Sequence, residues 1–129
     1  MFPKFLLKKM YEKHSLSINE NKDGFNFIIK NSIANGHVIE VYLLSLNDEE
    51  IPFDMITITN ETQEMNADNI SPENSVELKK GVHTKFSIKS LDALKFIDQE
   101  VKIHMKFKVQ VRDSKMTIEF DFHDVLKSN

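Results

Sequence analysis

The chain of 129 residues lacks cysteine and tryptophan and holds only three glycines and three prolines. Without cysteine it has no disulfide, no thiolate metal site and no cysteine nucleophile. Because small secreted domains usually depend on disulfides, this absence favours a reducing compartment, and we expect a cytoplasmic protein. Gly24, Gly36 and Gly81 are too scattered for a glycine-rich phosphate loop, and no Gly-x-Ser-x-Gly nucleophile motif is present.

Long apolar runs are also missing. The start of the chain mixes Phe2, Phe5 and Leu6 with lysines, so its apolar run is too short for a signal peptide, and no stretch is as long as a transmembrane helix. A basic amphipathic start can bind a membrane surface, but this apolar face is short, and we expect no membrane partner. Residues 1–14 fit a helix, and 10–18 fit a strand equally well.

What the chain does have is alternation with a period of two. Every second residue is apolar from Val101 to Val111, and the pattern resumes from Met116 to Phe122. This period is typical of half-buried strands. We predict a long hairpin closed at Asp113-Ser114, which pairs Val111 with Met116. In that register three polar pairs face each other, namely Lys108 with Glu119, Lys106 with Asp121, and His104 with His123.

Two further hairpins are predicted earlier in the chain, at Asp23-Gly24 and at Asn35-Gly36. The second would pair Ile29 with Tyr42. The segment 38–46 is apolar at nearly every position, which predicts a central strand covered on both faces. Strands are also expected at 55–59, 76–78 and 84–88, while 91–97 fits either a helical turn or a loop that plugs the end of a sandwich.

These segments amount to about eight strands at short spacing, with no internal repeat. We therefore predict an all-β fold in one domain over residues 1–129, an antiparallel β-sandwich that is immunoglobulin-like or jelly-roll-like. A chain of this length can bury a real core without covalent crosslinks.

Charge is unevenly distributed along the chain. Residues 31–78 contain no lysine or arginine and hold ten acids, which leaves 17 basic and 10 acidic groups elsewhere. One interpretation is an acidic and a basic face that dock electrostatically, on another copy or on a partner. The alternative is that distant strands interleave and largely neutralise the charges, and this is what we expect for a sandwich.

The candidates for chemistry are few. The predicted pairing of His104 with His123 brings Asp121 to a diagonal position, and two imidazoles with a carboxylate can hold a zinc or similar divalent ion. The alternative is a set of solvent-facing polar residues. We expect no nucleic-acid binding, because Phe107 and Phe120 point away from the face that carries the lysines.

The sequence resembles a small family of uncharacterised archaeal proteins over nearly its whole length. The segments that carry the resemblance are Phe2–Tyr11, Ser15–Ser17, Asp23–Phe25, Lys30–Ala34, Ala67–Asn74 and Gly81. Members of that family sometimes carry a hydroxymethylglutaryl-CoA reductase label, but this chain is too short for the enzyme and has no nucleotide-binding loop. The resemblance leads us to expect a glycine where His14 stands.

The layout also resembles the small β subunit of bacterial C-glycoside deglycosidases. The shared features are an early Gly-Phe strand, a turn such as Asn47–Pro52, a polar excursion and a late hairpin. The resemblance implies an accessory β-sandwich that packs on a catalytic partner, and it carries over no catalytic residue.

We therefore expect a non-enzymatic β-sandwich that acts by protein–protein contact, as a homo-oligomer or an accessory subunit, without a cofactor. The alternative is a metal-dependent enzyme or binder centred on His104, His123 and Asp121. A sugar-binding module has less support, because two tyrosines and no tryptophan leave few platforms for stacking sugar rings.

Overall fold

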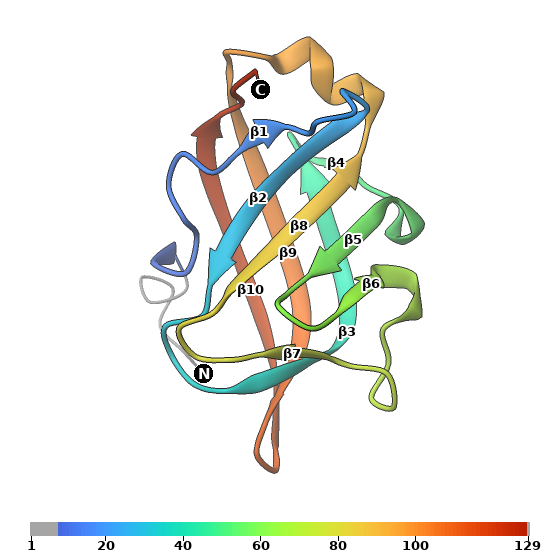
Figure 1. Cartoon of the computed structure of the whole chain (residues 1–129), viewed down its shortest axis with the longest axis vertical. Coiled ribbons are helices and arrows are strands. Elements are labelled where there is room, and N and C mark those ends of the chain that lie inside the picture. Colours follow the sequence, from blue (N-terminus) through green and yellow to red (C-terminus); the bar gives the residue numbers. More distant parts are fainter. Residues whose placement is uncertain (1–7, 129) are drawn as a thin grey trace.

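A computed structural model describes residues 8–128, which form two antiparallel sheets packed face to face (Figure 1). The first sheet has the order β1-β2-β8-β5-β6, and the second has the order β10-β9-β3-β4, with β7 also paired to β3. The strands are β1 Ser17–Ile18, β2 Gly24–Lys30, β3 Gly36–Leu46, β4 Glu49–Glu50, β5 Ile56–Thr59, β6 Glu64–Asn66, β7 Val76–Leu78, β8 His83–Lys89, β9 Glu100–Val111 and β10 Ser114–Val125. The predicted all-β sandwich is confirmed.

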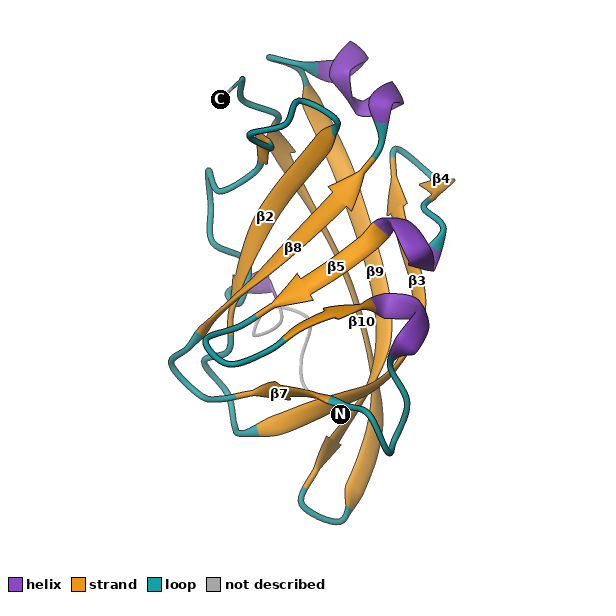
Figure 2. Ribbon diagram, turned by 45° about the vertical axis from the view of Figure 1, so that its right-hand side comes forward, coloured by secondary structure: helices purple, strands orange, loops and turns teal. Residues whose placement is uncertain are grey.

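Three short 3₁₀ helices connect the strands, and Figure 2 shows them in purple at the end and one side of the sandwich. They are η1 Phe53–Met55, η2 Ala67–Asn69 and η3 Leu91–Phe96. Of the two alternatives for residues 91–97, the helical turn is therefore present. It covers one end of the sandwich and buries Ala93 completely.

The core lies between the inner faces of the two sheets. The alternation predicted for β8, β9 and β10 places their apolar residues inside and their polar residues outside. Phe27 of β2 stacks on Phe86 at 5.1 Å between ring centroids and meets the edge of Phe122 from the other sheet at 5.3 Å. Such aromatic pairs add about 0.5–1.5 kcal/mol to the free energy gained from burial.

The last hairpin is present, but its predicted register is wrong by two residues. The loop contains only Arg112 and Asp113, so Val111 pairs with Ser114 and Val109 pairs with Met116. Arg112 adopts a positive φ of 56°, which allows this tight connection. A shift of two residues keeps every side chain on its predicted face, because the side-chain period of a strand is two, and it changes only the partners.

The hairpin predicted at Asn35-Gly36 is also wrong. Strand β2 pairs with β1 and β8, whereas β3 pairs with β9, so residues 31–35 cross from one sheet to the other. The buried amide of Asn31 holds this crossover, donating to the carbonyl oxygens of Ala34 and Leu78 at 2.6 and 2.9 Å. Gly36 is closely packed, since a Cβ there would lie 3.1 Å from the carbonyl oxygen of Gln110 and its neighbours would have to shift by a few tenths of an ångström.

Strand β3 is central, as predicted, with β9 on one side and the short β4 and β7 on the other. It is not covered evenly on both faces, because register irregularities at Ile39 and Tyr42 interrupt its pairing with β9. Each irregularity is a bulge, which changes the phase of the side chains. One consequence is that Tyr42 becomes exposed while Leu44 stays buried.

The charges do not interleave as expected. Strands β5 and β6 of the first sheet and β3, β4 and β7 of the second come from the acidic segment, and they lie along the same edge of the sandwich. Within residues 8–128, only Asp48 and Glu77 of the ten acids in this segment form an ion pair. The sandwich therefore has an acidic edge, formed by β3, β4, β5, β6 and β7, where most carboxylates have no basic partner within residues 8–128.

The opposite edge is closed by residues 8–16. Tyr11 forms an isolated bridge with Ile29, and its ring stacks on Phe122 at 3.7 Å between centroids. His14 has a φ of 68°, in the left-handed region where a glycine was expected. Much of the N-terminal segment for which helix and strand were both considered, residues 1–7, lies outside the described part of the chain.

Candidate protein-docking groove

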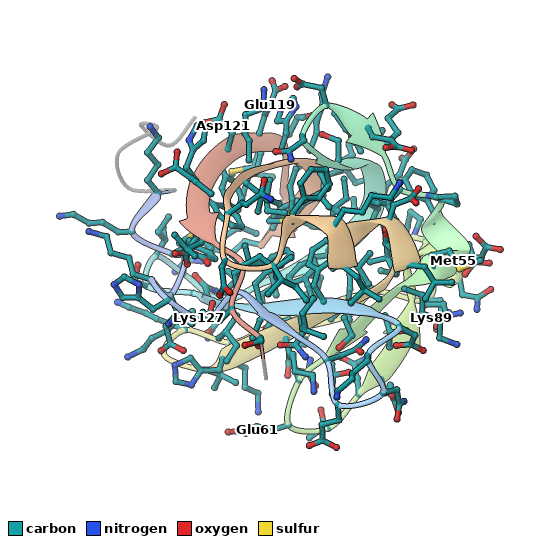
Figure 3. All side chains as sticks on the ribbon, turned by 90° about the horizontal axis from the view of Figure 1, so that it is seen from above. Met55, Glu61, Lys89, Glu119, Asp121 and Lys127 are labelled. Carbon is teal, nitrogen blue, oxygen red and sulfur yellow. The ribbon has the colours of Figure 1, made fainter. Side chains whose placement is uncertain are left out.

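The outer face of the C-terminal hairpin carries the residues that the sequence singled out for metal binding. The pairing of His104 with His123 is wrong, because the tight loop places His104 opposite Asp121 and His123 opposite Lys102. His104 Nε2 lies 2.8 Å from Oε2 of Glu119, a residue that sequence reasoning had paired elsewhere. Figure 3 shows Glu119 and Asp121 projecting from this face.

No group of three or more metal-ligating side chains is brought together anywhere in residues 8–128. Metal binding by His104, His123 and Asp121 stays a prediction. Of these three residues, the structure places His104 and Asp121 directly opposite each other on neighbouring strands.

A nearby ion pair shifts the pKa values of its two members. Lys102 Nζ lies 2.7 Å from Oδ1 of Asp48, and this hydrogen bond lowers the pKa of Asp48 and raises that of Lys102.

The most apolar hollow among those of residues 8–128 is an open groove of about 560 Å³ at the end of the sandwich near η3. We call it the docking groove. It is lined by residues from the β1–β2 turn, the β3–β4 hairpin, η1, the end of β8 and η3, including Leu46, Ile51, Pro52, Met55, Leu91 and Phe96. A second hollow of about 430 Å³, lined by Tyr42, Leu43 and Phe53 among others, shares Glu50, Ile51 and Pro52 with it.

The β3–β4 hairpin fixes one wall of the docking groove. Its loop consists of Asn47 and Asp48, with φ of 50° and 68°, which Asn and Asp tolerate better than other residues with a Cβ. The backbone of Asn47 donates to the carbonyl oxygen of Lys102, and its side-chain oxygen accepts from the same residue's N–H, both at 2.9 Å. Together with the Asp48 ion pair, these bonds hold the hairpin against β9.

The other wall comes from η3 and the residues before it. Ser90 donates its backbone N–H to the carbonyl oxygen of Asp23 at 2.9 Å, which ties the start of η3 to the β1–β2 turn. Ala93 faces the core and Leu91 faces outward with 70% of its surface exposed. Met55 of η1 is 40% exposed, and Figure 3 labels it on the same side of the molecule as Lys89.

The rim of the docking groove is acidic. Glu49, Glu50 and Asp92 are exposed there and Asp23 is half-buried, while Lys89 is the one basic residue that lines it. Glu49 and Glu50 form no ion pair within residues 8–128, and Asp92 pairs with Lys95 at 3.4 Å. An exposed apolar surface with a charged rim is the usual form of a protein-binding site.

Sequence reasoning missed this groove. Its residues come from five separated segments, and none of them shows a periodic pattern that predicts their meeting. No sequence signal marked Leu91 or Met55, because both stand among other apolar residues such as Leu94 and Ile56. Within residues 8–128, no helix has the length and apolar character required to span a bilayer.

The fold and the groove define a β-sandwich domain with an open apolar groove at one end. The chain belongs to the family described as hydroxymethylglutaryl-CoA reductase, N-terminal domain, whose model matches residues 6–126. A comparison with curated proteins found no match.

Proposed function

We propose that this domain is a non-catalytic module that acts by binding a protein through the docking groove. The observation that carries the proposal is the exposure of Leu91 beside Met55 and Phe96, over a groove with carboxylates at its rim. Covering one such side chain contributes about 1.5–3 kcal/mol, so a partner that fills the groove gains a substantial part of its binding energy there.

The family relationship is compatible with this role. Its description names an N-terminal domain of a reductase, which is a part of an enzyme and need not carry the chemistry. The layout shared with the β subunit of C-glycoside deglycosidases likewise supports an accessory domain that packs on a catalytic partner. An archaeal origin and a cytoplasmic location complete the proposal, the latter supported by the absence of cysteine.

Three proteins test the proposal, namely the wild type, Leu91→Asp and the matched control Val125→Asp. Val125 is 41% exposed on β10 and does not line the groove, so it offers an equivalent apolar-to-acidic change elsewhere. We expect the wild type and the control to form the same assembly, with themselves or with a protein copurified from the source cell, and Leu91→Asp to lose it. Identical behaviour of the three proteins would contradict the proposal.

A further inference from the structure

We propose that the docking groove binds the N-terminal segment, residues 1–8, of a second copy of this chain. The inference rests on the proposed function, because it names the partner that fills the same groove.

The N-terminal segment is both apolar and basic. It carries Phe2, Phe5, Leu6 and Leu7 together with Lys4 and Lys8, and the first acid of the chain is Glu12. Adjacent Phe and Leu side chains suit a groove lined by Ile51, Met55 and Leu91. The segment therefore complements the groove in both apolar character and charge.

The rim supplies the opposite charge. Glu49 and Glu50 stand at the groove with no ion-pair partner within residues 8–128, and Asp23 and Asp92 stand on the facing side. Lysines that enter between these carboxylates gain complementary charge on both walls, which fixes orientation and speeds association. Because the rim is exposed, this contribution falls as salt is added.

The positions of the two features favour a partner over the same chain. Tyr11 lies beside Ile29 near the end of β2, whereas the groove is lined by Asp23, just before the start of β2, together with the β3–β4 hairpin and η1. Tyr11 and the groove of the same copy therefore lie at opposite ends of β2. A contact between different surfaces of two copies is heterologous, so it produces a ring or a growing chain.

Complementation between two defective variants tests this arrangement. Leu91→Asp places a charge in the groove and leaves the N-terminal segment unchanged. Phe5→Asp/Leu6→Asp places charges in the segment and leaves the groove unchanged. We expect each variant alone to be monomeric, with self-association weakened at least about tenfold. Mixed in equal amounts, they should form a dimer and stop, because only one functional interface remains. The wild type should form larger assemblies whose mass falls with added salt.

Other outcomes overturn the inference and separate it from the proposed function. If the mixture stays monomeric, or if the wild type itself is monomeric at every concentration, the segment does not bind a second copy. Assemblies that are lost in Leu91→Asp but kept in Phe5→Asp/Leu6→Asp would show another occupant, and the proposed function would stand. Met55→Asp changes a second exposed residue of the groove and should also abolish association, which shows that the effect is not confined to residue 91.

Discussion

The phenol of Tyr11 donates a hydrogen bond to Oδ2 of Asp124, which joins the N-terminal segment to the last strand across 113 residues of sequence. The same carboxylate oxygen accepts the backbone N–H of His14 at 2.8 Å. Asp124 therefore holds both ends of a short loop, including a residue with a left-handed backbone, and its side chain is only 8% exposed. This contact closes one edge of the sandwich.

Removing the Tyr11 hydroxyl should destabilise the protein measurably. Tyr11→Phe keeps the ring that stacks on Phe122 and deletes one hydrogen bond to a largely buried carboxylate. We expect a loss of about 1–2 kcal/mol in the free energy of unfolding, measured with urea. Tyr42→Phe is the matched control, since the hydroxyl of Tyr42 forms no hydrogen bond within residues 8–128, and it should change nothing. Equal stability of the two variants would contradict this role for the Tyr11–Asp124 bond.

The same contact should make stability fall at alkaline pH. Burial, helped by the hydrogen bond to Asp124, raises the pKa of Tyr11 above its ordinary value near 10. Above about pH 10 the unfolded chain loses this proton while the folded chain keeps it, so the contribution of Tyr11 is lost as the pH rises further. Unfolding of the wild type and Tyr11→Phe should be compared from pH 9 to 11.5. The advantage of the wild type should shrink above pH 10, and a constant difference would refute this explanation.

Two glycines should respond differently to substitution, because each is required for a different reason. A Cβ on Gly24 would lie 1.8 Å from the carbonyl oxygen of Ile88, so Gly24→Ala must push β2 away from β8. We expect a loss of at least about 2–3 kcal/mol, or failure to fold. Gly81 has open space around it but a φ of 86°, so Gly81→Ala should cost only about 1 kcal/mol. Thermal unfolding ranks the two variants, and the reverse order would show that the close approach at Gly24 relaxes easily.

The crossover between the sheets should depend on Asn31. Its amide donates to two carbonyl oxygens, and its oxygen accepts the N–H of Ile33 at 3.1 Å. Asn31→Ala leaves the carbonyl oxygen of Leu78 without its buried donor, so we expect a loss of about 2–3 kcal/mol. Asn35→Ala is a useful comparison, because Asn35 accepts a single exposed bond from Lys80 and should cost less. Similar losses for both variants would mean that the buried amide has no special role.

The comparison of sequence and structure is most instructive at the two hairpins. Alternation placed Phe107, Ile118 and Phe120 correctly inside, since any even shift of register keeps the faces. It could not choose between a turn at Asp113-Ser114 and the observed loop Arg112-Asp113, because both satisfy the pattern. The partners of His104 and His123 depended on that choice, and the structure places Asp121, in place of His123, opposite His104.

Asn35-Gly36 shows a different limit. The pair has the composition of a hairpin turn, but Gly36 does not adopt the positive φ that such a turn needs. Its small size lets β3 approach β9 closely, and of the three glycines only Gly81 has a positive φ. A local signal cannot reveal that β2 and β3 belong to different sheets. The docking groove was beyond sequence reasoning for the same reason, since Asp23, Glu50, Met55 and Leu91 meet only through the sheet topology.

The central claim is that the chain acts through its docking groove, and light scattering coupled to size-exclusion chromatography tests it most directly. The wild type, Leu91→Asp and Val125→Asp should be compared over a wide range of protein concentration. The claim predicts that the wild type and Val125→Asp associate to the same extent, while Leu91→Asp stays monomeric with unchanged thermal stability. The claim is contradicted if Leu91→Asp associates as strongly as the wild type.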